Sequence, residues 1–115
     1  MAVFKEKENL PKQVTPGFAR RIANLSNLMM VVCEFTNGPA DDPDVPHTHP
    51  HEQITYVEEG ELYLFTGDEQ HHLQKGDIYT IPSGIPHGIQ TLSSFVRLID
   101  CFSPVRDEFI ETGGW

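Results

Sequence analysis

Three histidines and a glutamine have the residue types and the spacing of a metal site. His47 and His49 lie two positions apart, Gln53 follows them, and His87 comes later in the chain. On a β-strand, residues i and i+2 point to the same face, so the first two histidines can share one centre. Imidazole nitrogen is a good ligand for divalent transition metals. We therefore predict a site for one divalent transition metal ion, Ni, Zn, Mn or Fe, held by His47, His49, Gln53 and His87.

Gln53 has two interpretations. As an amide-oxygen ligand it cancels none of the metal's charge, so the ion would attract an anionic ligand and act as a Lewis acid. The alternative is a polar residue that stands beside a three-histidine site without binding the metal. Non-haem iron oxygenases commonly include a carboxylate among their ligands, so a glutamine at this position argues against oxygen chemistry.

A second group of residues near the C-terminal end could move protons. Asp100 and Phe102 lie on one face of an expected strand, and Arg106 follows that strand. A carboxylate among apolar neighbours needs a partner, a raised pKa or a chemical role. One interpretation is a salt bridge between Asp100 and Arg106 that fixes the end of the chain. The other is a catalytic group next to the metal.

Short strands must position these residues. Strand-like segments cover residues 18–24, 28–37, 53–59, 61–67, 71–74, 78–81, 87–91 and 95–102, and Gly60 and Gly76 mark turns between them. We expect an irregular lead-in with a short edge strand over residues 1–17, a surface loop over 38–46 and a helical turn over 104–110. Short strands with frequent turns and almost no helical period predict an all-β sandwich or barrel.

Two pairs of residues have open interpretations. Arg20 and Arg21 are adjacent in the first expected strand, so one side chain faces inwards and one outwards. They are either solvated arginines at a rim or include one inward arginine near an anionic ligand. Cys33 and Cys101 lie in apolar runs without a CxxC motif, so we expect buried, reduced cysteines.

Length and composition limit the class of protein. The chain has 115 residues, which predicts one domain over residues 1–115 with its core at about residues 18–104. A net charge of −9 argues against a nucleic-acid partner. No leader-like segment or long apolar run is present in the sequence, so we expect no membrane association and a cytoplasmic location. The small core favours a homodimer.

Two motifs in the chain resemble those of the cupin family. The first cupin motif reads G-x5-H-x-H-x3,4-E-x6-G, and the second reads G-x5-P-x-G-x2-H-x3-N. The matching residues are His47, His49, Gln53 and Gly60 in the first motif, and Gly76, Pro82, Gly84 and His87 in the second. Asp41 and Thr91 replace the first glycine and the last asparagine, and Gln53 replaces the glutamate. The resemblance implies a single-domain cupin jelly-roll β-barrel with one metal ion inside.

The pattern Asp100-x-Phe102-x-x-x-Arg106 after such a core resembles the small KdgF-type cupins of pectin degradation and uronate catabolism. This family implies conversion of 4,5-unsaturated uronates, released by pectin or alginate lyases, to linear 5-keto-4-deoxyuronate. The resemblance also implies roles for three residues. Asp100 would move a proton as general acid or base, Arg106 would pair with the carboxylate or polarise a water, and Phe102 would pack against the sugar.

Three functions are therefore compatible with the sequence. The first is a metal-dependent isomerase that acts on an anionic sugar. The second is a cupin dioxygenase, or another isomerase, with the same metal site. The third is a non-enzymatic module that binds a sugar acid or a metal. Oxygen consumption by an iron-loaded sample would distinguish the second function, and tight binding without chemical change would favour the third.

Overall fold

Nine strands form two sheets in residues 1–107, the part of the chain that the computed structural model describes. In the larger sheet the strand order is β1-β2-β3-β9-β4-β7. The bounds are Lys12–Thr15 (β1), Phe18–Asn24 (β2), Met29–Phe35 (β3), Val96–Ser103 (β9), Glu52–Glu59 (β4) and Ile78–Ile81 (β7). The smaller sheet has the order β6-β5-β8, with bounds Glu69–Gln74 (β6), Glu61–Thr66 (β5) and His87–Thr91 (β8). A short 3-10 helix, Glu6–Glu8 (η1), precedes β1.

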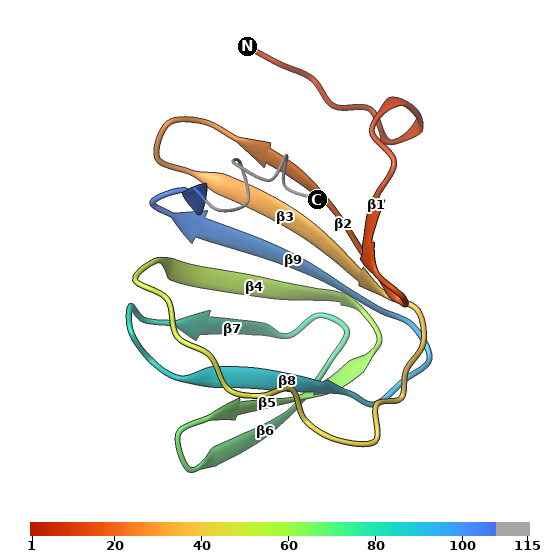
Figure 1. Cartoon of the computed structure of the whole chain (residues 1–115), viewed down its shortest axis with the longest axis vertical. Coiled ribbons are helices and arrows are strands. Elements are labelled where there is room, and N and C mark those ends of the chain that lie inside the picture. The colour runs from red at the N-terminus through yellow and green to blue at the C-terminus, as the bar shows by residue number, and fades with distance from the viewer. Residues whose placement is uncertain (108–115) are drawn as a thin grey trace.

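The two sheets pack against each other through an apolar core. The larger sheet contributes Val57 and Leu98 and the smaller sheet contributes Leu62 and Leu64, all at most 4% exposed. Figure 1 shows the larger sheet in the upper part of the molecule and the smaller sheet below it. Within β4 buried and exposed residues alternate, as period-2 side-chain geometry requires. The prediction of an all-β sandwich or barrel is confirmed.

The predicted strands match the observed ones closely. Each of the eight predicted segments begins and ends within two residues of an observed strand, and β1 lies in the lead-in where a short edge strand was expected. One local expectation was wrong. The segment that contains His47 and His49 is not a strand, because it forms only an isolated bridge at His47. The predicted helical turn over residues 104–110 extends outside the described residues.

The loop between β3 and β4 follows the free edge of β8, as Figure 1 shows. The amides of Ala40 and Asp44 donate to the carbonyl oxygens of Thr91 and Ile89, at 3.0 and 2.9 Å. The loop is largely exposed, as predicted, yet these bonds hold it on the smaller sheet. Its last residues are therefore delivered to a fixed position beside β8.

Both cysteines are free thiols. Cys33 is buried and Cys101 is partly buried, in agreement with the prediction of reduced cysteines in apolar surroundings. Residues 1–107 contain no helix with the length and hydrophobicity that a membrane span requires.

Candidate metal centre and the adjoining cavity

Backbone hydrogen bonds fix the first two histidines next to the strand that carries the third. The amides of His47 and His87 each donate to the other residue's carbonyl oxygen, at 2.9 and 3.0 Å. The amide of Gly84 donates to the carbonyl oxygen of His49 at 2.9 Å. Gly84 has a φ of 78°, a conformation that favours glycine, and this turn brings the loop before β8 against His49.

His47, His49 and His87 form a compact cluster, which we call the three-histidine cluster. One ring nitrogen from each residue lies within 4.8 Å of the others. His49 and His87 are 6% and 4% exposed, whereas His47 is exposed. Three imidazole nitrogens at this spacing can bind one metal ion, and the more open His47 leaves a path from solvent to the cluster.

The ring orientations suit metal binding. The Nδ1 atoms of His49 and His87 lie 2.9 Å from the carbonyl oxygens of His51 and Ile85. A carbonyl oxygen accepts a hydrogen bond, so each Nδ1 carries the proton and each Nε2 keeps a free lone pair. Histidines that bind metals commonly have this second hydrogen bond. Burial and the neighbouring histidines lower the pKa of His47 and His87, which favours the neutral, metal-binding form.

Gln53 directs its amide oxygen at the cluster. Its Oε1 lies 3.1 Å from His49 Nε2, and its amide nitrogen donates to Thr55 Oγ1 at 2.9 Å. The Thr55 hydroxyl in turn donates to Asp100 Oδ1 at 2.5 Å. Because the hydroxyl has one proton, which goes to the carboxylate, Thr55 must accept from the NH₂ group of Gln53. This direction of donation fixes the oxygen of Gln53 towards His49.

These residues fit a metal ion. A neutral imidazole has one N–H, and His49 uses it at Nδ1, so Nε2 and Gln53 Oε1 face each other as two electron-pair donors. Two ligand atoms that are each about 2.1 Å from one ion lie about 3.0 Å apart at the 90° angle of octahedral coordination and about 3.4 Å apart at the tetrahedral angle. The observed 3.1 Å between these two atoms lies within that range. The donor set of three imidazoles and one amide oxygen suits a divalent transition metal.

Asp100 is held in a buried polar chain between the two sheets. Its second oxygen, Oδ2, accepts from the thiol of Cys33 at 3.5 Å, and its first oxygen accepts from the fully buried Thr55. Burial raises the pKa of Asp100, whereas the hydrogen bonds from Thr55 and Cys33 and the charge of Arg106 oppose that rise. Asp100 can therefore hold or release a proton nearer to neutral pH than an ordinary aspartate.

Phe102 lies between the His49 ring and the guanidinium of Arg106 and contacts both. Phe102 is 3% exposed and packs edge-on against the His49 ring, with 5.7 Å between ring centroids and 83° between planes. The guanidinium carbon of Arg106 lies 5.2 Å from the centroid of the Phe102 ring, a cation–π arrangement. Arg106 thus stands beside the three-histidine cluster and Asp100, where its charge also lowers the pKa of His47 and His87.

A cavity of about 160 Å³ adjoins the cluster, and most of the predicted site residues share it. The predicted residues in its wall are His47, Gln53, His87, Asp100, Phe102 and Arg106. The structure therefore brings both predicted groups together, although residues from widely separated parts of the chain supply them. His49 lies directly behind this wall, in contact with Gln53 and Phe102.

Two residues of the site were not assigned from the sequence. Thr55 links Gln53 to Asp100, and its signal is the period of two that places it on the same face of β4 as Gln53. Arg20 also lines the cavity, so the inward-arginine interpretation describes its position better than a solvated rim. The sequence signal for Arg20 is its alternation with the apolar residues Phe18 and Ile22, which lie on the same face of β2 and pack against the core.

Comparison with known proteins agrees with this architecture. The Cupin domain family (Cupin_2) matches residues 31–99. The pectin degradation protein KdgF of Dickeya dadantii (strain 3937) is 33% identical over 109 residues, which cover 93% of this chain and 96% of the relative. The solved structure of KdgF from Halomonas sp. has a TM-score of 0.84 and 34% identity, and covers 94% of this chain and 99% of its own.

A second solved structure, an RmlC-like cupin from Shewanella frigidimarina, has a TM-score of 0.82 and 28% identity over 92% of this chain and 93% of its own. The predicted cupin jelly-roll barrel is therefore confirmed. The chain belongs to the cupin family, among the relatives of the pectin degradation protein KdgF.

Proposed function

We propose that this protein is a metal-dependent isomerase that opens the ring of 4,5-unsaturated uronate monosaccharides to give linear 5-keto-4-deoxyuronate. One observation carries the proposal. The three-histidine cluster and Asp100, a carboxylate with a raised pKa, adjoin one small cavity. Relatedness to pectin degradation proteins over nearly the whole chain supports a substrate that comes from pectin.

The size and charge of the cavity support a small anionic substrate. Its volume of about 160 Å³ is below the range of a few hundred Å³ that is usual for drug-sized ligands, and suits a single sugar ring. The chain has a net charge of −9, so its overall field repels an anion. The positive charges needed to hold a uronate must therefore be local, and Arg106 provides one of them.

His47, His49, Gln53 and His87 are the proposed metal ligands. When bound there, a divalent ion would supply Lewis-acid stabilisation of negative charge on a substrate oxygen. None of these four ligands is negatively charged, so the protein leaves the charge of the ion available to the substrate. The chain from Gln53 through Thr55 to Asp100 connects the metal ligands to the proposed proton-transfer group.

The proposed reaction is an isomerisation without oxidation. The hydroxyl on C1 of the sugar loses its proton, the bond between C1 and the ring oxygen breaks, and an aldehyde forms at C1. The electron pair of the broken bond forms an enolate at C5, and C4 then takes a proton, which leaves a ketone at C5. Asp100 is proposed to accept or deliver that proton, because burial raises its pKa above that of an ordinary aspartate and so favours proton uptake as well as release.

Phe102 and Arg106 are proposed to control the surroundings of the reacting atoms. The Phe102 ring forms an apolar part of the cavity wall and would pack against the sugar and exclude water. Arg106, positioned over this ring, would stabilise the negative charge that develops on the ring oxygen. Neither role requires a change in the fold, because both side chains already border the cavity.

The test is a turnover assay with freshly prepared 4,5-unsaturated galacturonate. Metal-loaded protein should accelerate loss of the C4–C5 double bond well above the spontaneous rate, and a sample treated with a chelator should not. No acceleration with Ni, Zn, Mn or Fe would refute the proposed function. Oxygen consumption by the iron-loaded protein would then favour a dioxygenase, and binding without conversion would favour a sugar-acid binding module.

We also propose that the protein is a homodimer. The outer faces of the adjacent strands β4 and β7 carry Ile54, Tyr56 and Ile78, which are 55, 40 and 63% exposed. An apolar group of this kind on one sheet face supports contact with a second copy. Sedimentation should give about twice 13.0 kDa, and a monomeric mass at all concentrations would contradict this. One domain over residues 1–115 and a cytoplasmic location remain predictions.

A further inference from the structure

Arg20 lies on the inner face of the larger sheet. Residues 18, 20 and 22 of β2 share one face, and both Phe18 and Ile22 pack against the core. Arg20 itself lines the cavity that Asp100 and His87 border. The cationic side chain of Arg20 therefore borders the space that the proposed substrate would occupy. β2 contributes none of the predicted metal ligands, so Arg20 would act on the substrate and not on the metal.

The strand order separates Arg20 from the metal ligands. β2 carries Arg20 and β4 carries Gln53, and β3 and β9 lie between these two strands. Three spacings of about 4.8 Å put the backbones of β2 and β4 roughly 14 Å apart. Arg20 is paired with Cys33 in the β2–β3 register. It therefore stands at the opposite end of the cavity from the three-histidine cluster.

Arg106 occupies the other end. It follows β9 and lies over Phe102, which is paired with Gln53 in the β4–β9 register. Asp100 is two residues before Phe102 and contacts Thr55 on one side and Cys33 on the other. The order along the cavity is thus the metal ligands with Arg106, then Asp100, then Arg20.

A uronate matches this order. It has a carboxylate at C5 and a hydroxyl at C1, on either side of the ring oxygen, and the bonds that change lie between and beside them. Guanidinium groups bind carboxylates through two parallel hydrogen bonds, and this geometry fixes orientation as well as position. We propose that Arg20 binds the carboxylate of the uronate and thereby directs C1 towards the three-histidine cluster. This inference rests on the proposed function and names the residue that selects the acidic sugar.

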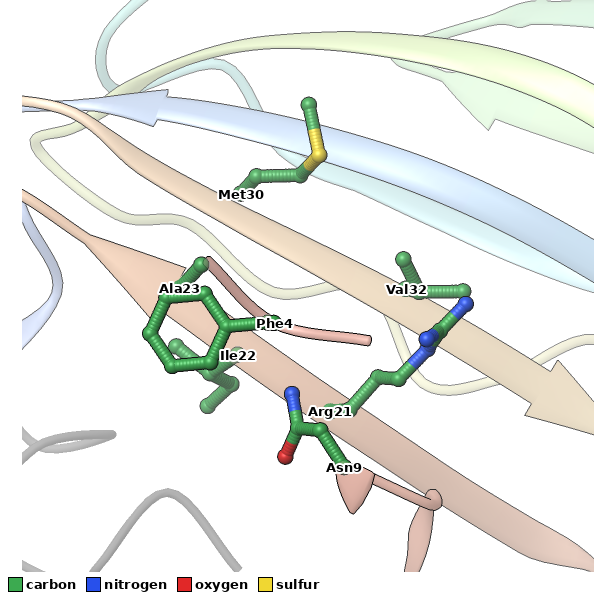
Figure 2. Close-up of a pocket in the computed structure, with 7 residues that line it drawn as sticks. All are labelled: Phe4, Asn9, Arg21, Ile22, Ala23, Met30 and Val32. Atoms are coloured by element: carbon green, nitrogen blue, oxygen red, sulfur yellow. The ribbon is translucent and has the colours of Figure 1, made fainter. Parts of the chain in front are cut away.

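The neighbouring Arg21 provides a matched control. It lies on the outer face of β2, where it lines a separate hollow of about 280 Å³. Figure 2 shows its side chain beside Val32, with Phe4 and Asn9 of the N-terminal segment on the same face. Its guanidinium forms an ion pair with the carboxylate of Glu6 at 4.0 Å. Substitution of Arg21 removes the same charge from the same strand, without altering the cavity.

The first test compares Arg20→Met, Arg20→Lys and Arg21→Met in the turnover assay. Loss of a charge-assisted pair should raise the KM of Arg20→Met roughly 10- to 100-fold, with kcat changed much less. Arg20→Lys keeps the charge but not the paired geometry, so its KM should rise by about 3- to 10-fold. Arg21→Met should behave as wild type. A KM for Arg20→Met equal to that of Arg21→Met would overturn the proposal.

The second test does not depend on turnover. Binding of galacturonate and of galactose to metal-loaded protein is followed by NMR, and metal content is measured in every sample. Wild type should prefer galacturonate, and Arg20→Met should lose that preference at unchanged metal content. If Arg20→Met keeps the preference, the carboxylate is held elsewhere and the inference is wrong, whatever the activity.

The two tests separate this inference from the proposed function. Wild type without activity, but with a preference for galacturonate that Arg20→Met loses, would refute the function and support Arg20 as the carboxylate site. Activity in wild type with an unchanged KM in Arg20→Met would support the proposed function and refute Arg20 as the carboxylate site. If Arg20→Met does not fold, Arg20→Lys decides the question, because a wild-type KM in that variant would contradict paired recognition.

Discussion

Replacement of Thr55 by valine tests the buried polar chain directly. Thr55 is fully buried, accepts a hydrogen bond from Gln53 and donates one to Asp100. Valine has nearly the same shape but no hydroxyl, so Thr55→Val removes both bonds without opening a cavity. The substitution leaves the amide of Gln53 and one oxygen of Asp100 without these partners.

The expected cost follows from those two groups. A buried polar group that loses its partner costs about 1–3 kcal/mol. Two such groups predict that Thr55→Val lowers the free energy of unfolding by about 2–6 kcal/mol at pH 7. Asp100 keeps the thiol of Cys33 as a donor at 3.5 Å, and this weaker contact limits the loss.

The loss should also depend on pH. Burial raises the pKa of Asp100, so its ionisation already lowers the stability of wild type as the pH rises through the folded-state value. The Thr55 hydrogen bond opposes that rise, so the pKa of Asp100 is higher still in Thr55→Val. Below about pH 4 the carboxyl is protonated in both proteins and this part of the difference disappears. The variant should therefore lose more stability at pH 7 than at pH 4.

Urea unfolding at both pH values, with chelator present and at one protein concentration, measures these differences. Thr15→Val is the control, because Thr15 is an exposed residue of β1 in the same sheet and lies away from the proposed dimer face. Its effect should stay within about 0.5 kcal/mol. A loss for Thr55→Val that is below about 1 kcal/mol, or equal at the two pH values, would show that Thr55 does not stabilise an ionisable, buried Asp100.

Three further substitutions test two residues of the cavity and one ion-pair network outside it. Asp100→Asn should abolish turnover and leave metal content unchanged, as measured by elemental analysis; normal turnover would rule out the proposed proton transfer. His87→Ala should lose bound metal and the rise in Tm on metal addition, since it removes one of three imidazoles at the cluster; full metal occupancy would count against this ligand. Arg97 donates to Glu34 and Glu58 at 2.6–2.9 Å in a partly exposed network. Arg97→Met should therefore lower the free energy of unfolding by about 1 kcal/mol or less, and this loss should shrink in high salt. A loss that salt does not alter would indicate that Arg97 stabilises the fold by packing instead.

The strands were predictable because their signals are local. Alternation in β4 and the glycine turns at Gly60 and Gly76 are legible within a few residues, and both glycines have positive φ, at 90° and 96°. The segment around His47 was the exception, because it was expected to be a strand and is not one. Pro46 and Pro50 flank it and lack an N–H group, so it cannot form a regular ladder and makes only one bridge.

The composition of the site was only partly predictable. The spacing of His47 and His49 is a local signal, and so is the loop that precedes His87. The contact between Thr55 and Asp100 depends on the register of β4 against β9, which joins residues 45 positions apart and has no local signature. Arg20 was ambiguous for a different reason, because the phase of β2 becomes clear only when Phe18 and Ile22 are known to be in the core.

The proposed metal ligands belong to both layers of the barrel. Gln53 is on the larger sheet, His87 is on the smaller sheet, and the loop that carries His47 and His49 is bonded to the latter. An ion bound by all four would act as a reversible cross-link between the sheets. Free ion at a hundred times its Kd would then add about 2.7 kcal/mol to the stability of the fold. Preparations of one sequence with different metal contents would melt at different temperatures and resist proteolysis to different degrees, so batch-to-batch variation would itself report on occupancy of the site.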